Sequence, residues 1–179
     1  MQSFSRRGFQ LRTASLETRV AYTGFVLLML PGVATLLVLS LGRVGFAPAA
    51  IATYYRGGES EMSFPKTFWQ LMEVSHFHFF SVPVVLLVLA HLLYATPVST
   101  RVRIWLTAAV FTGAFLEAAG PWAIRYASAA FAFALLGGWV LLGGGCLAIV
   151  AITLVSMWGP ESWVARISSP MPANGGDLR

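Results

Sequence analysis

The stretch 73-EVSHFHFFSVPVVLLVLAH-91 decides the fold, because it is long and apolar enough to enter a bilayer and holds all three histidines of the chain. An α-helix needs about 20 mainly apolar residues to cross the hydrocarbon. A ligating or ionisable side chain is costly there, so a histidine inside such a helix indicates a functional site. The stretch therefore predicts a transmembrane helix that carries a site.

The composition excludes a soluble domain. The 179 residues are 57% hydrophobic and only 11% charged, whereas soluble domains carry about 25% charged residues. The single cysteine, Cys146, excludes an intrachain disulfide, and the absence of a Cys-x-x-Cys-His motif excludes covalent c-type haem. The net charge of +5 fits basic residues flanking membrane spans, and we expect the lipid bilayer and no nucleic acid as a partner.

Four apolar segments predict an all-α integral membrane protein with four transmembrane helices. The predicted spans cover about residues 20–41, 76–95, 104–119 and 127–158, with an outer loop at 43–75 and tails at 1–19 and 159–179. Each span should be helical, because lipid offers the backbone no hydrogen-bond partner. Ser63 and Pro65 form a plausible helix start, with serine as N-cap, so the second helix is expected to begin well before residue 76.

The positions of lysine and arginine predict both termini in the cytoplasm. Eight basic residues fall on the side of the termini: Arg6, Arg7, Arg12, Arg19, Arg101, Arg103, Arg166 and Arg179. Four fall on the other side: Arg43, Arg56, Lys66 and Arg125. Since cytoplasmic loops carry the excess of positive charge, we expect a multi-pass protein of the bacterial inner (cytoplasmic) membrane.

The histidines suggest a haem site. His76 and His91 lie about 60° apart around a helix and about 22 Å apart along it, whereas His78 and His91 lie about 140° and about 20 Å apart. Two histidines at opposite depths of one span resemble the geometry of membrane b-type cytochromes. This resemblance, limited to one helix, implies that His91 and His76 (or His78) bind haem b. Because the other spans hold no histidine, the second ligand would come from another copy, another subunit, or Met29 or Met157.

A second group is expected at the outer end of the bundle. It combines carboxylates with imidazoles, and its members are Glu73, His76, His78 and Glu117. Such a group suits a metal ion, a proton relay or a quinone head group, and the candidate metal ligands are His76, His78, His91, Glu73 and Glu117. The alternative is a salt-bridge or capping cluster with Arg125 and Lys66.

Glycines concentrate in the fourth span. Gly137 and Gly144 are seven residues apart and share a helix face. Small residues let membrane helices approach closely, so we expect this face to lie against another helix or a flat tetrapyrrole.

These observations favour a membrane subunit of an electron-transfer complex, binding haem b and relaying electrons between quinone and a partner protein. The soluble parts are too small for a catalytic head, so a non-catalytic subunit is favoured over an enzyme. Expected partners are other membrane subunits or a second copy, and a periplasmic electron-transfer protein at the loop Tyr54–Glu73. The alternative is a structural or accessory subunit without a redox cofactor, or one that binds a pigment or metal.

Overall fold

The computed structural model describes residues 10–59 and 62–163. Most of the predicted tails, with Arg6, Arg7, Arg166, Arg179 and the loop residue Glu61, lies outside these ranges. A short 3-10 turn, η1 (Leu11–Thr13), precedes α1 (Leu16–Leu39), which continues into a π-helical turn, η2 (Ser40–Val44). The remaining elements are α2 (Pro48–Arg56), α3 (Phe68–Tyr94), α4 (Thr100–Tyr126) and α5 (Phe131–Trp158).

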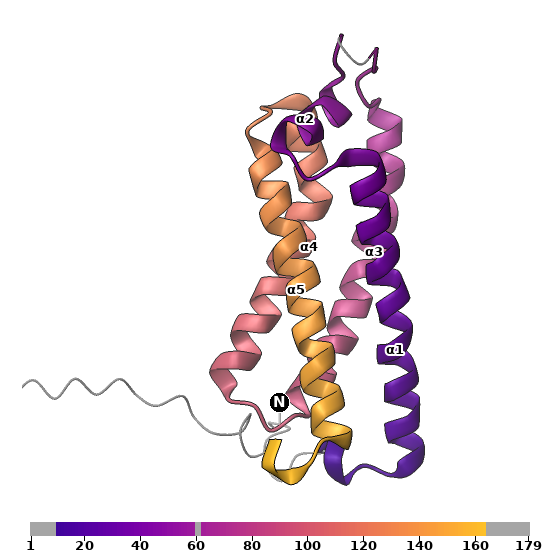
Figure 1. The fold of residues 1–179 in the computed structure, drawn as a ribbon, viewed down its shortest axis with the longest axis vertical. Coiled ribbons are helices and arrows are strands. Elements are labelled where there is room, and N and C mark those ends of the chain that lie inside the picture. Colours follow the sequence, from indigo (N-terminus) through magenta and orange to yellow (C-terminus); the bar gives the residue numbers. More distant parts are fainter. Residues whose placement is uncertain (1–9, 60–61, 164–179) are drawn as a thin grey trace, which may run out of the picture.

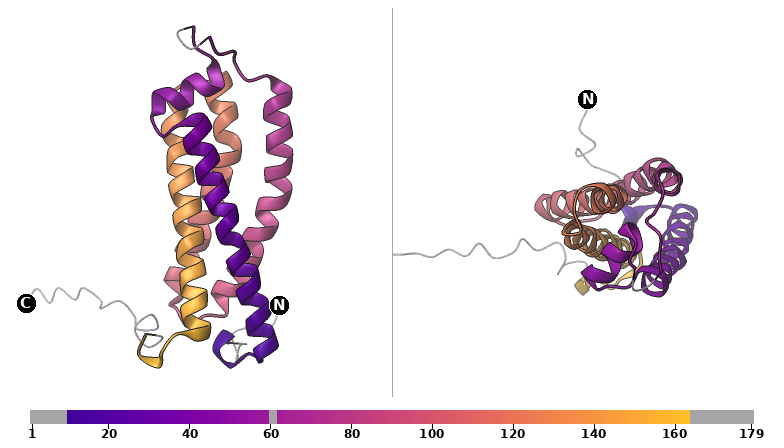
Figure 2. Two further views of the ribbon diagram at one scale, coloured as in Figure 1. Left: turned by 45° about the vertical axis from the view of Figure 1, so that its right-hand side comes forward. Right: turned by 90° about the horizontal axis from the view of Figure 1, so that it is seen from above.

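The predicted four-helix membrane fold is confirmed. Four helical segments are long and apolar enough to cross a membrane: Leu16–Val44, Phe68–Tyr94, Thr100–Tyr126 and Phe131–Trp158. They run alongside one another, and the short α2 lies across one end of the bundle (Figures 1 and 2). We call this end the α2 end, and the opposite end, which holds η1 and the end of α5, the terminal end. Which end faces the cytoplasm stays a prediction.

The second membrane helix, α3, begins earlier than residue 76 and is capped by a residue other than Ser63. The N-cap is Thr67, whose hydroxyl accepts from the Gln70 N–H at 3.2 Å, while the Gln70 side chain accepts from the Thr67 N–H at 2.9 Å. This reciprocal capping box satisfies two free backbone donors. Ser63 instead pairs with Gly58 in the preceding turn. Because α3 ends at Tyr94, His91 lies in its last turn, at the terminal end.

The predicted outer loop 43–75 contains a helix, α2, that the hydropathy pattern did not indicate. Pro48 occupies its first turn, where the missing N–H is not needed. Gly57, at φ 80°, ends it in a conformation that favours glycine. Ile51 is fully buried and packs with Ile124 and residues of α5. The helix therefore covers the α2 end of the bundle.

The helices α4 and α5 meet through glycines, but through a different glycine face of α5 than expected. A Cβ placed on Gly145 would lie 2.5 Å from Val110 Cγ1, and one on Gly113 would lie 2.5 Å from the Leu142 backbone nitrogen. By contrast, a Cβ on Gly137 or Gly144 would meet no heavy atom within 4 Å. Within the described part of the chain, no helix therefore packs against Gly137 or Gly144, and a tetrapyrrole or a helix of another subunit against this face stays a prediction. Consecutive glycines on a helix point in directions about 100° apart. The hydropathy pattern does not indicate which of these directions faces α4.

The first helix is attached mainly at the terminal end. The Arg19 guanidinium donates to the Met157 carbonyl and lies 3.9 Å from the ring centroid of Trp158. The Trp158 indole N–H donates in turn to the Thr23 hydroxyl at 2.9 Å. Elsewhere α1 packs loosely, and Val26 is its only buried residue among the side chains that the structure describes. The opposite end of α1 is thus free to border a cavity.

Candidate functional site

A cavity of about 350 Å³ lies at the α2 end, between the end of α1 and the other helices. Its wall is built from six elements and the connection before α3, and most of the wall area is apolar although many of the lining residues are polar. The polar residues include Arg43, Tyr55, Gln70, His78 and Glu117. A mainly apolar pocket with a few converging polar groups is typical of small-molecule sites.

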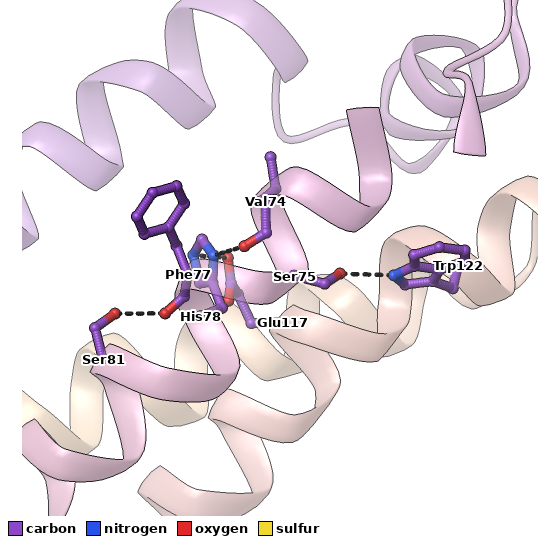
Figure 3. Close-up of polar contacts among 7 residues, drawn as sticks. All are labelled: Val74, Ser75, Phe77, His78, Ser81, Glu117 and Trp122. Carbon is purple, nitrogen blue, oxygen red and sulfur yellow. Dashed lines mark hydrogen bonds and ion pairs between the residues drawn. The ribbon is translucent and has the colours of Figure 1, made fainter. Parts of the chain in front are cut away.

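An imidazole and a carboxylate meet at the wall of this cavity. The distance from His78 Nε2 to Glu117 Oε1 is 3.2 Å, and the side chains are 28% and 12% exposed. The His78 Nδ1 lies 2.7 Å from the Val74 carbonyl oxygen, one turn back on α3 (Figure 3). Since a carbonyl only accepts, Nδ1 carries a hydrogen. One further proton is then shared between Nε2 and Oε1, and the pair as a whole is neutral.

The second carboxylate oxygen has no partner. Glu117 Oε2 is buried, and no hydrogen-bond donor contacts it within residues 10–59 and 62–163. A buried acceptor without a partner is costly, and such groups in native proteins usually receive a hydrogen bond. Glu117 as a residue lines the cavity, but Oε2 itself has no surface exposed to it.

A contact from α4 to α3 positions the histidine. The Trp122 indole N–H donates to the Ser75 hydroxyl at 2.6 Å (Figure 3). Ser75 precedes His78 by three residues and therefore shares its helix face. The Trp122 ring is itself packed against Phe68, at 5.3 Å between ring centroids, and Tyr126, at 6.0 Å. This aromatic group fixes the rotation of α3 that turns His78 toward α4.

Arg125 and Lys66, the two cations expected near Glu117, have other partners. Arg125 Nε donates to the Lys66 carbonyl oxygen at 3.0 Å, and the Lys66 ammonium lies 4.2 Å from the ring centroid of Tyr54. Neither forms an ion pair with Glu117 in the part of the chain that the structure describes. The predicted alternative, a salt-bridge cluster with Arg125 and Lys66, is therefore not the arrangement around Glu117.

Tyr55 is a cavity residue that the sequence did not identify as part of a site. It lies on α2, outside the membrane-spanning helices, and lines the same cavity. Burial raises the pKa of the Tyr55 phenol above its ordinary value, and the charges of Tyr54 and Glu117 act in the same direction. The hydroxyl therefore stays protonated and remains a hydrogen-bond donor. The only sequence signal was an aromatic pair in a hydrogen-bond-rich loop.

The structure separates the other predicted site residues. Glu73 lines the cavity, but the exposed His76 packs its ring beside Phe77 and Phe80, at centroid distances of 5.8 and 5.2 Å. His91 is also exposed, and its Nδ1 lies 2.8 Å from the Leu87 carbonyl oxygen. Of the predicted group of four, His78 and Glu117 are brought into contact, while His76 faces away.

The proposed metal ligands do not gather into one site. No three His, Cys, Asp or Glu side chains come together as a metal site would require, within the ranges that the structure describes. The haem-ligand roles of His76 and His91 stay predictions, and so does the source of the second ligand, whether another copy, another subunit, Met29 or Met157.

A comparison with known families identifies the fold family. Residues 45–163, more than half of the chain, match Aq_1264_TM, a transmembrane helical domain. The chain belongs to this family. The Aq_1264_TM match covers α2 to α5, and so includes the His78–Glu117 pair and the covering helix, whereas α1 lies outside it. Neither the curated proteins nor the solved structures give a match to the chain.

Proposed function

We propose that this chain is a membrane subunit of an electron-transfer complex and that its cavity at the α2 end binds the head group of a quinone. The observation that carries the proposal is the neutral His78–Glu117 pair on the wall of the cavity. The cavity volume of about 350 Å³ lies at the lower end of the range of roughly 300–1,000 Å³ for small-molecule sites. A quinone head, one ring with two oxygens, suits such a space.

The polar groups of the cavity match the chemistry of a quinone and its quinol. Oxidation of one quinol to the quinone releases two electrons and two protons. The electrons pass one after the other to a one-electron acceptor held by a partner subunit, which hands on the first before it takes the second. The His78–Glu117 pair takes one proton from a quinol hydroxyl, and the second proton leaves to water at the α2 end. The Tyr55 hydroxyl, held protonated by burial, is a donor for a quinone carbonyl.

Haem b belongs to the proposal as a component shared with a partner. Because His91 donates Nδ1–H to the Leu87 carbonyl, its Nε2 is the nitrogen left to bind iron, and metal-bound histidines usually make this second bond. The second axial ligand then comes from another subunit or a second copy. The excess of arginine at the terminal end supports an orientation with the cavity on the periplasmic side, where α2 and its flanking turns would face a soluble electron-transfer partner.

The alternative is an accessory subunit that binds no redox molecule. In that case the cavity is filled by lipid or by a side chain of a neighbouring subunit, and quinone interacts with the protein only by partitioning into the bilayer. The two functions therefore differ in whether quinone binding is saturable.

Fluorescence quenching tests the proposal. Trp139 lines the cavity, so a short-chain benzoquinone bound there should quench its emission. We expect saturable quenching of the purified full chain in nanodiscs of quinone-free lipid. The matched control is Trp139→Phe, in which the saturable part should fall while the quenching of exposed tryptophans persists. Quenching that rises linearly with quinone, identical in both proteins, would contradict the proposal.

A further inference from the structure

The side chain of Gln70, in the first turn of α3, has one group bound in the helix cap and a second group free. Its Oε1 accepts from the Thr67 N–H at 2.9 Å. Because a backbone N–H can only donate, the atom that faces it is the amide oxygen, and the cap leaves the Nε2 amino group unused. Within residues 10–59 and 62–163, no protein group accepts a hydrogen bond from this Nε2.

The free amino group belongs to an exposed side chain of the cavity wall. Gln70 is exposed and lines the cavity, so a bound molecule can reach it, whereas Glu117 Oε2 has no accessible surface. Gln70, Val74 and His78 follow one another at intervals of four residues and form one stripe along α3. All three line the cavity. Gln70 therefore offers two N–H donors to a ligand that lies along this stripe.

The spacing of Gln70 and His78 matches the length of a quinone head group. Eight residues of helix rise about 12 Å. Both side chains lean toward the start of α3, because Gln70 bonds to Thr67 and His78 Nδ1 lies against the Val74 carbonyl oxygen, so the difference in height is kept. A six-membered ring with an oxygen at each end, and a hydrogen bond of about 2.9 Å beyond each oxygen, covers a distance of this order.

We infer that Gln70 binds the ring oxygen that lies away from the His78–Glu117 pair, so that the ligand needs an acceptor oxygen at that end of the ring. The inference rests on the proposed function and deepens it, because it assigns the residue that orients the head group. The amide donates to a quinone carbonyl or to the oxygen of a quinol hydroxyl, and so holds both redox states. A carbonyl oxygen accepts two hydrogen bonds, and the Tyr55 hydroxyl, on the same wall, can supply the second.

The substitution Gln70→Glu separates the two roles of this side chain. Glutamate keeps an oxygen for the Thr67 N–H and suits the same position of a capping box, but its second oxygen is an acceptor and not a donor when ionised. The variant should therefore be as stable as the wild type, whereas a short-chain benzoquinone should bind about tenfold more weakly. Calorimetry on the full chain in nanodiscs of quinone-free lipid gives the dissociation constants, and detergent titration gives the stability.

The matched control is Thr67→Ala, which removes the cap hydroxyl and leaves the Gln70 amide in place. Thr67 does not line the cavity in the described part of the chain. This variant should lose stability, because alanine cannot cap the helix, and yet bind the benzoquinone with nearly wild-type affinity. Opposite responses of the two variants would show that the amide donor, and not the helix cap, holds the ligand.

The outcomes also separate the inference from the proposed function. Wild-type affinity in Gln70→Glu, or an equal loss of affinity in both variants, would overturn the role of Gln70 and leave the quinone site standing. If the wild type itself shows no saturable binding of benzoquinone, the quinone site and the role of Gln70 both fail.

Discussion

Gly113→Ala should destabilise the folded protein by about 3 kcal/mol, at the upper end of the cost of overpacking. The added methyl would lie 2.5 Å from the Leu142 backbone nitrogen, 2.8 Å from the Gly138 carbonyl oxygen and 3.0 Å from the Leu142 Cα. Backbone atoms in the middle of a helix cannot turn aside as a side chain can. The helices α4 and α5 must therefore move apart, and their contacts weaken along the interface. The free energy of unfolding by detergent titration measures the effect.

The control is the same substitution on the open face of α5. At Gly137 an added Cβ meets no heavy atom within 4 Å. Since alanine favours a helix over glycine by about 1 kcal/mol in the interior, Gly137→Ala should be neutral or slightly stabilising. An equal loss of unfolding free energy at Gly113 and Gly137 would contradict the structure, in which Gly113 lies against α5 and Gly137 contacts no other helix of the chain.

His78→Leu alone should destabilise the fold by about 3 kcal/mol, because it leaves the Glu117 carboxylate buried without its partner. Replacing both residues with leucine removes the polar pair altogether. A buried pair replaced by apolar residues of similar volume is often neutral or stabilising, so the double variant should regain most of the lost stability. Unfolding free energies of the two single variants and the double variant give the coupling between the residues.

The same double variant separates stability from function. It should fold and yet bind quinone less tightly than the wild type, since the pair supplies part of the polar contacts of the cavity. A double variant as unstable as the single one would argue against the His78–Glu117 contact. A stable double variant that still binds quinone with unchanged affinity would make the pair irrelevant to the ligand.

The fold class could be predicted from the sequence because it depends on one property, the length of apolar runs. The boundaries were less accessible, because they depend on local hydrogen bonds. The second membrane helix starts at Phe68 because Thr67 and Gln70 cap it. The apolar run that indicated this helix in the sequence begins several residues later, at His76. The short α2 was missed because its apolar residues are few and its proline and glycine signals lie in a polar context.

The candidate site could be predicted only in part. The sequence placed His78 and Glu117 at the same depth of the bundle, and the structure joins them at 3.2 Å. It did not indicate which face of α3 turns inward, because apolar residues occur on every side of that helix. The spacing from His91 favoured His76 over His78, whereas the Trp122–Ser75 hydrogen bond sets a rotation of α3 that brings His78 to Glu117. Tyr55 lines the cavity because α2 packs on α4 and α5. A local sequence pattern does not predict such a tertiary contact.

The most direct test of the central claim is photolabelling with a diazirine-bearing quinol, kept reduced, followed by identification of the labelled residues by mass spectrometry. If the head group lies beside the His78–Glu117 pair, labels should concentrate on the cavity wall, in peptides that contain Tyr55, Gln70 and Glu117. Excess unlabelled quinol should remove them. Labels spread evenly over lipid-facing residues such as Phe80 and Val140, which are 72% and 73% exposed, and insensitive to competition would contradict the site.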